Sequence, residues 1–260
     1  MNNAKAPLDS IPVRQAVAYA IDRDAIVARL FGALGVTQAS QSLNPPITSE
    51  IGNQEAWAGY VKDLGKVDQL LTGDGWAKGS DGIYAKGGKK LSLTVITTAG
   101  NQRRELTEQI LQEQLKQAGI ELKIKNQSAD QLFGTTLVKG DYQLTIYGQT
   151  NTNLEPSLCV IMCSDQIPSK ANDNSGQNYT RTNIPEIDPL LTAVDQNSDD
   201  AARNVAQSQA DVIMAAQQVT LPIDPLPNIA IWNNKITAPN LSDNPILGMF
   251  WNMNTWQLQG

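Results

Sequence analysis

The sequence contains no histidine, and this absence excludes several kinds of chemistry at once. Histidine is the commonest general base, the commonest metal ligand in proteins, and the side chain that most often changes charge near neutral pH. Catalytic systems of the Ser-His-Asp and Cys-His kinds therefore cannot form within this chain. A zinc site would have to use cysteines and carboxylates alone, which is unusual. We accordingly expect no catalytic residues, no metal site and no cofactor.

Long apolar runs and an excess of positive charge are also missing. No stretch of about 18 apolar residues occurs, so no segment is expected to span a membrane. The formal net charge is −6, whereas nucleic-acid-binding proteins usually carry a basic face. The N-terminus shows no basic segment followed by an apolar one, which would mark an export signal. We therefore expect no nucleic-acid partner and interpret the interspersed charges as a solvated surface.

Only two cysteines are present, Cys159 and Cys163, four positions apart. In an oxidising compartment they could close a small disulfide ring if the local backbone brings their Cα atoms within about 7 Å. In a continuous helix the same spacing puts them on one face, where thiols more often stay free and packed. Two cysteines do not decide between these alternatives and do not identify the compartment.

The first predicted element is a helix from Val13 to Phe31, where apolar residues mostly recur at steps of three and four. Three charged residues within it, Arg14, Asp22 and Arg23, are expected to form a surface ion-pair network that contributes little stability. The residues that follow, 35–60, contain the sequence Asn-Pro-Pro and are interpreted as a long surface loop.

Residues 91–147 alternate between strand-like and helix-like patterns. The strand-like stretches alternate apolar and polar residues, and the helical stretches begin with capping residues and end at glycines. The predicted strands are 91–95, 122–124 and 142–146, and the predicted helices are 101–118 and 128–139. This order predicts parallel strands joined by helices, and hence an α/β fold.

The polar segment after the third predicted strand is the candidate binding site. In open α/β sheets, ligands bind at the carboxyl ends of the strands. Residues 148–156, Gly-Gln-Thr-Asn-Thr-Asn-Leu-Glu-Pro, follow such an end and are rich in uncharged hydrogen-bonding groups. The residues expected to contact a solute are Gln149, Thr150, Asn151, Thr152 and Asn153. A solvated loop without ligand contact is the alternative.

Five blocks of sequence resemble the extracellular solute-binding proteins of family 5, which bind peptides, oligopeptides and nickel for ABC importers. The blocks are Val13–Val27, Leu70–Tyr84, Leu115–Ile120, Gly140–Tyr142 and Asn178–Asp188. Motifs such as Gly-Trp or Asp-Gly are common by themselves, so the specificity of the resemblance comes from five blocks in family order. It covers residues 13–191, and residues 221–256 resemble the family's C-terminal part more loosely.

The resemblance implies a periplasmic-binding-protein type II fold, in which two lobes close on a solute and present it to a membrane permease. Residues 1–220 are then expected to form the second lobe, with a mixed sheet flanked by helices. Residues 221–260 are expected to return to the first lobe. The implied function is that of the substrate-binding component of an ABC importer: not an enzyme, monomeric, extracellular or periplasmic, and commonly lipid-anchored. Family members are much longer, so the first lobe and the export signal are expected to lie outside this sequence.

The identity of the solute depends on one departure from the family pattern. In peptide-binding relatives, the loop that corresponds to Gln149–Asn153 carries an aspartate that pairs with the α-amino group of the ligand. Alignment on Glu155-Pro156 puts Thr152 at that position. A threonine hydroxyl accepts a hydrogen bond from an ammonium group but supplies no compensating charge. A peptide, a modified peptide and a neutral polar solute therefore all remain open.

Two alternative functions also remain open. The first is a partner-binding or sensory domain that has this fold and no transport role. The second is a carboxylate-based hydrolase, such as a glycoside hydrolase, for which Glu155, Asp165 and Asp173 supply the acidic residues. Nothing in the sequence determines how far apart these carboxyl groups lie.

Overall fold

A computed structural model describes residues 1–44, 51–148, 158–227, 229, 231–237 and 250–258 of the chain. The α-helices are α1 (Ile11–Tyr19), α2 (Arg23–Phe31), α3 (Leu64–Gly73), α4 (Gln102–Gln117), α5 (Ala129–Gln131), α6 (Leu137–Lys139), α7 (Cys159–Met162), α8 (Asp188–Gln196) and α9 (Asp200–Ala216). The strands are β1 (Ala77–Lys78), β2 (Tyr84–Lys86), β3 (Lys89–Lys90), β4 (Ser92–Ile96), β5 (Glu121–Ile124) and β6 (Leu144–Thr145). Short helical turns are η1 (Gly32–Leu34), the π-helical η3 (Leu132–Thr136), η4 (Ser164–Gln166), η5 (Lys170–Asn172) and η6 (Met253–Thr255).

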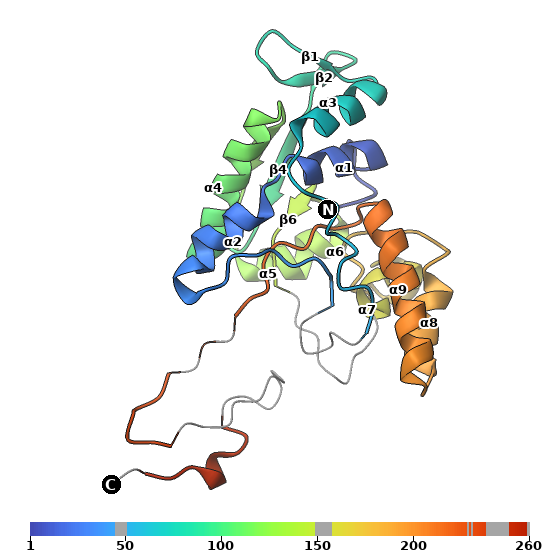
Figure 1. Ribbon diagram of the computed structural model, residues 1–260. Helices are drawn as coiled ribbons and strands as arrows, with labels where there is room; N and C mark the ends of the chain where they lie inside the picture. The colour runs from blue at the N-terminus through green and yellow to red at the C-terminus, as the bar shows by residue number, and fades with distance from the viewer. Residues whose placement is uncertain (45–50, 149–157, 228, 230, 238–249, 259–260) are drawn as a thin grey trace.

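A parallel sheet of the order β5-β4-β6 forms the centre of the fold (Figure 1). Strand β4 pairs in parallel with both neighbours, and Leu93 lies opposite Leu122 in the register. Helix α4 connects β4 to β5, and the helical segment from α5 to α6 connects β5 to β6. The predicted α/β layer of residues 91–147 is therefore confirmed. A separate antiparallel sheet, β1-β2-β3, accounts for the other strands, so within the described residues the two strand directions occupy two sheets instead of one mixed sheet.

Two large apolar clusters form most of the core of the described residues. The first joins the parallel sheet to α1, α3 and α4, and its fully buried residues include Leu93 and Leu115. The second joins α7, α8 and α9, and it encloses Trp57 and Met214, which are 0% exposed. Leu221 contacts both clusters, so the chain that follows α9 helps to hold the two parts together.

The single helix predicted for residues 13–31 is wrong, because the chain ends α1 at Tyr19 and begins α2 at Arg23. The side chain of Asp22 caps α2 by accepting a hydrogen bond from the backbone N–H of Ala25 at 2.9 Å. The backbone N–H of Asp22 in turn donates to the side chain of Gln114 on α4. A capping aspartate stabilises a helix start, so the break occurs although the apolar spacing continues across it.

The predicted surface ion-pair network of Arg14, Asp22 and Arg23 is also wrong. Both arginines are only 4% exposed, and their guanidinium groups donate mainly to backbone carbonyls. The acceptors are the carbonyl oxygens of Leu8, Gln217 and Gln218 for Arg14, and those of Ser40, Trp57 and Pro222 for Arg23. Burial lowers the pKa of both groups. The two arginines thus connect α1 and α2 to residues that follow α9.

The stretch predicted to be a long surface loop, residues 35–60, is packed into the protein at its C-terminal end. Trp57 is fully buried and its indole N–H donates to the carbonyl of Thr220 at 3.0 Å. The hydroxyl of Tyr60 donates to the carbonyl of Ala215 at 2.7 Å. These contacts explain why the stretch needs large aromatic residues.

The C-terminal part leaves the body of the protein after Asp224. That residue forms an ion pair with Arg103 on α4, at 2.9 Å. Beyond it, many apolar side chains are exposed, and Figure 1 shows the described residues 231–237 and 250–258 lying apart from the rest. The strongly exposed residues there include Leu226, Ile231, Phe250 and Leu258.

Candidate functional site

The carboxyl ends of the three parallel strands are tied together by the two threonines that follow β4. The hydroxyl of Thr97 donates to the carbonyl of Ile146, just after β6, at 2.7 Å. The backbone N–H of Thr97 donates to the side chain of Asn126, just after β5, at 3.1 Å. Thr98 forms a parallel bridge with Gln127. The edge at which α/β proteins bind their ligands is thus built as one connected unit.

Arg104 places a cation at this edge. It lies in the first turn of α4, and the side chain of Asn101 caps that turn by accepting from the Arg104 backbone N–H at 3.1 Å. Its Nη1 donates to the hydroxyl of Thr98 at 2.8 Å. A Cβ atom built on Gly148 would lie 3.9 Å from its Nη2. The guanidinium group therefore lies between the end of β4 and the point at which the chain enters residues 149–157.

The Arg104 guanidinium has an unused donor. Its Nε is buried and has no hydrogen-bond partner among the described residues. Burial lowers the pKa of Arg104, and the neighbouring Arg103 lowers it further. A guanidinium remains charged in proteins, so its planar N–H donors are suited to a carboxylate, which can accept two of them at once.

A second polar connection lies behind this edge, between Asn126 and the carboxyl group of Glu108 on α4. The Asn126 Nδ2 donates to Glu108 Oε2 at 2.8 Å. Glu108 is 0% exposed, and burial raises the pKa of its carboxyl group above the ordinary value. Its other oxygen has no hydrogen-bond partner among the described residues.

The residues predicted to bind the solute, Gln149, Thr150, Asn151, Thr152 and Asn153, lie outside the described residues. Their assignment stays a prediction. Arg104 was not singled out from the sequence, although one signal was present. It stands in the first turn of a helix that directly follows a parallel strand, and that position faces the ligand-binding edge of an open sheet.

The structure joins Cys159 and Cys163 by a disulfide, with an S–S distance of 2.02 Å and a Cα–Cα distance of 4.7 Å. The sequence had left free thiols as the alternative. The sulfur atoms and the carboxylate of Asp165 lie within 4.8 Å of one another. Because the disulfide leaves neither sulfur as a thiolate, this group offers no metal site in this state.

The acidic residues considered for hydrolysis are only partly covered by the described residues. Glu155 lies outside it. Asp165 and Asp173 are both exposed and belong to the separate turns η4 and η5, Asp173 being the residue that ends η5.

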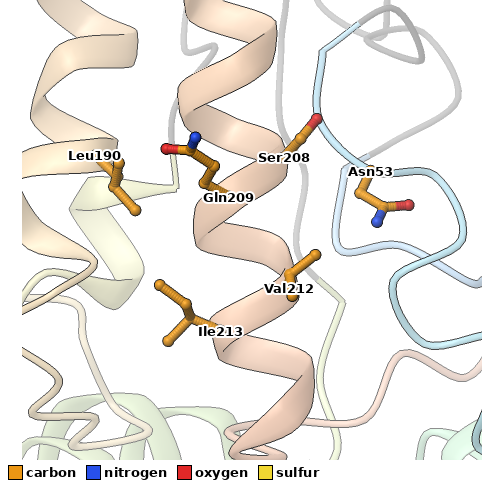
Figure 2. A pocket seen from close by; sticks show the side chains of 6 residues that line it. All are labelled: Asn53, Leu190, Ser208, Gln209, Val212 and Ile213. Carbon is orange, nitrogen blue, oxygen red and sulfur yellow. The ribbon is translucent and has the colours of Figure 1, made fainter.

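Two pockets of the described residues lie away from the carboxyl edge of the sheet. The larger, about 490 Å³, is an open apolar hollow between α8 and α9, and Figure 2 shows the side chains that surround it. Its lining residues are Asn53, Leu190, Ser208, Gln209, Val212 and Ile213. The second, about 260 Å³, lies between the N-terminal residues and residues 181–184. Neither includes Thr98, Arg104 or Gly148.

No helix within the described residues combines the length and the apolar character that crossing a bilayer requires.

Comparison with known proteins gives one family and one fold. Residues 1–166 match the family described as bacterial extracellular solute-binding proteins, family 5 Middle. The chain is similar to the oligopeptide-binding protein AppA of Bacillus subtilis (strain 168), with 37% identity over 116 residues. That match covers 43% of this chain and 20% of the relative.

Solved structures agree over a larger part of the chain. The structure of AppA from Bacillus subtilis in complex with a nonapeptide superposes with a TM-score of 0.78 at 24% identity, and the match covers 100% of this chain and 49% of AppA. The oligopeptide-binding protein from Thermus thermophilus, complexed with a pentapeptide, gives a TM-score of 0.73 at 26% identity, over 83% of this chain and 38% of that one. The chain therefore spans about half the length of the proteins that it matches, or less.

Proposed function

Because the chain belongs to the bacterial extracellular solute-binding proteins of family 5, we propose that it forms one lobe of a binding protein that captures a peptide or another small polar solute for an ABC importer. The observation that carries the proposal is the position of Arg104. A half-buried guanidinium, held by the hydroxyl of Thr98, lies at the ligand-binding edge of the parallel sheet. Such a group recognises a carboxylate, which every unmodified peptide carries at its C-terminus.

The division of the chain follows the same proposal. Residues 1–220 form the second lobe, and residues 221–260 return toward the first lobe. The exposed apolar side chains after Asp224 support this division, because contiguous exposed apolar residues mark a surface that another part of a protein covers. The ion pair between Arg103 and Asp224 extends the lobe slightly beyond residue 220.

The mechanism is capture without chemical change. A solute bound at the carboxyl edge is enclosed when the first lobe closes over it, and the closed form is presented to the permease. The protein acts outside the cytoplasmic membrane, as a monomer and anchored by a lipid. Gln149 to Asn153 supply uncharged contacts to the solute. The similar proteins AppA and the Thermus thermophilus oligopeptide-binding protein were solved with bound peptides, which favours a peptide as the solute.

A titration of the chain with three related tripeptides tests this proposal. The probes are trialanine, its C-terminal amide and its N-acetyl derivative, and binding is followed by NMR shifts of the backbone amides. One lobe supplies only part of the contacts, so we expect millimolar affinity for trialanine. Loss of the carboxylate in the amide should weaken binding at least tenfold, or about 1.4 kcal/mol.

Arg104→Gln should abolish this preference for a free carboxylate, and the exposed Arg29→Gln on α2 serves as the matched control. Equal binding of trialanine and its amide by the unsubstituted chain would refute the role of Arg104. Absence of binding to all three probes would instead favour a partner-binding or sensory domain with this fold.

A further inference from the structure

Asn126 connects three elements directly behind the carboxyl edge of the sheet. It follows β5, its Oδ1 accepts from the backbone N–H of Thr97 after β4, and its Nδ2 donates to Glu108 on α4. Because the amide oxygen is occupied by an N–H donor, the amide nitrogen must face Glu108. The direction of the hydrogen bond to Glu108 is therefore fixed by the backbone.

Glu108 is an unfavourable residue for this position unless its carboxyl group is bonded. It is fully buried, and none of the ion pairs between described residues includes it. Burial raises the pKa of its carboxyl group, and the negative charge of the nearby Glu105 raises this pKa further. The hydrogen bond from Asn126 acts in the opposite direction and lowers it. A buried carboxyl without a cation costs stability unless its hydrogen bonds compensate. Within the described part of the chain it accepts one such bond, from Asn126.

The bond fixes the part of α4 that also carries Arg104. Arg104 and Glu108 are four residues apart, so they lie on the same side of the helix, one above the other. Arg104 contacts Thr98 at 2.8 Å, and the backbone of Thr97 contacts Asn126 at 3.1 Å. Arg104 therefore holds Thr98 directly, and Glu108 holds the adjacent Thr97 through Asn126.

We propose that Glu108 and Asn126 are positioning residues, which hold the first half of α4 at the spacing from the end of β4 that Arg104 needs to reach a solute carboxylate. The inference rests on the proposed function, because it assigns these residues to the same site. They do not touch the solute. Their contribution is to keep the guanidinium in place before the solute arrives, which lowers the entropic cost of binding.

Reversing the direction of this hydrogen bond tests the inference. Asn126→Asp places two carboxyl groups at the distance of the present 2.8 Å bond, where they can bond only by sharing a proton. We expect the affinity for trialanine to fall about tenfold at pH 8 and to recover partly at pH 5. In the double variant Glu108→Gln/Asn126→Asp, the new glutamine amide donates to the new carboxylate, which still accepts from the backbone N–H of Thr97. This variant should restore the affinity at both pH values.

Val67→Ala on α3 is the matched control, because Val67 is a buried core residue in a different part of the lobe. Its thermal destabilisation should leave the affinity for trialanine within about twofold, because the site is distant. An equal loss of affinity in Val67→Ala and Asn126→Asp would overturn the inference, since general destabilisation would then explain both. Unchanged affinity in Asn126→Asp at pH 8 would also overturn it.

Failure of the proposed function gives a different result. If trialanine does not bind to the unsubstituted chain, the proximity of the Arg104 guanidinium to the side chain of Thr98, to which it donates at 2.8 Å, decides the inference and is measured as an NMR cross-relaxation signal. We expect this signal to disappear in Asn126→Asp and to return in the double variant. Its persistence in Asn126→Asp would show that Arg104 is held without Asn126.

Discussion

Replacing Asp211 by asparagine tests a buried carboxylate that costs the protein stability at neutral pH. Asp211 lies on α9 and is 0% exposed. Its Oδ2 accepts from the side chain of Asn44 at 3.2 Å and from the backbone N–H of Asn53 at 2.8 Å. Its Oδ1 accepts from the side chain of Gln207 at 2.9 Å. Burial raises the pKa of Asp211 to about 6, although these three hydrogen bonds oppose the shift.

The raised pKa determines how stability depends on pH. The folded protein binds a proton at Asp211 more tightly than the unfolded chain, whose carboxyl group has the ordinary pKa of 3.8. The contribution of Asp211 to stability is therefore greatest below about pH 4, and it is lost as the pH rises through about 6. A difference of about two pH units corresponds to about 3 kcal/mol at neutral pH.

Asparagine can keep the geometry of Asp211 without the charge. Its side-chain oxygen accepts from Asn44 and Asn53, and its N–H₂ group faces Gln207. The Oε1 of Gln207 is buried and has no partner among the described residues, so rotation of that amide supplies an acceptor. We expect Asp211→Asn to increase the free energy of unfolding at pH 7.5 by as much as about 3 kcal/mol.

Urea unfolding between pH 4.5 and 7.5 measures this effect, with the exposed Asp173→Asn as the control. The difference between Asp211→Asn and the unsubstituted protein should grow with pH over this range and level off above about pH 7. A difference that is independent of pH, or a loss of stability in Asp211→Asn at pH 7.5, would refute the reasoning.

Two changes test the packing around the same region and the disulfide. Gly52→Ala should lower the free energy of unfolding by at least about 2 kcal/mol. Gly52 has a φ of +90°, and a Cβ there would lie 2.4 Å from Asn44 Nδ2 and from Asp211 Oδ2. Unchanged urea unfolding of Gly52→Ala would contradict this expectation. Replacing Cys159 and Cys163 by serine should cost about 2 kcal/mol, the value for closing so short a loop, and a reducing agent should lower the melting temperature only of the protein that keeps the disulfide.

The parallel layer could be predicted from the sequence because its signals are local. Asn101 and Ser128 cap the helices that follow β4 and β5, and the alternation of apolar residues marks the strands. The match of residues 1–166 to family 5 confirms the resemblance that the five sequence blocks suggested. Local patterns and the order of motifs were sufficient for the fold and for the family.

The errors concern residues whose partners are distant in the sequence. Arg14 was assigned to the surface, but it donates to carbonyls about 200 positions away, at Gln217 and Gln218. Asp22 lies within a run of helical spacing, and only its capping bond and the contact with Gln114 show that the helix ends. Arg104 is assigned to the candidate site because β4 pairs with β6 and brings Gly148 close to it. None of these contacts leaves a periodic signal in the sequence.

The position of a bound peptide in a crystal of the chain soaked with trialanine tests the central claim most directly. The account predicts that the peptide carboxylate lies about 3 Å from the guanidinium group of Arg104, beside Thr98 at the carboxyl edge of β4. A peptide bound instead in the apolar hollow between α8 and α9, with Arg104 unoccupied, would contradict it.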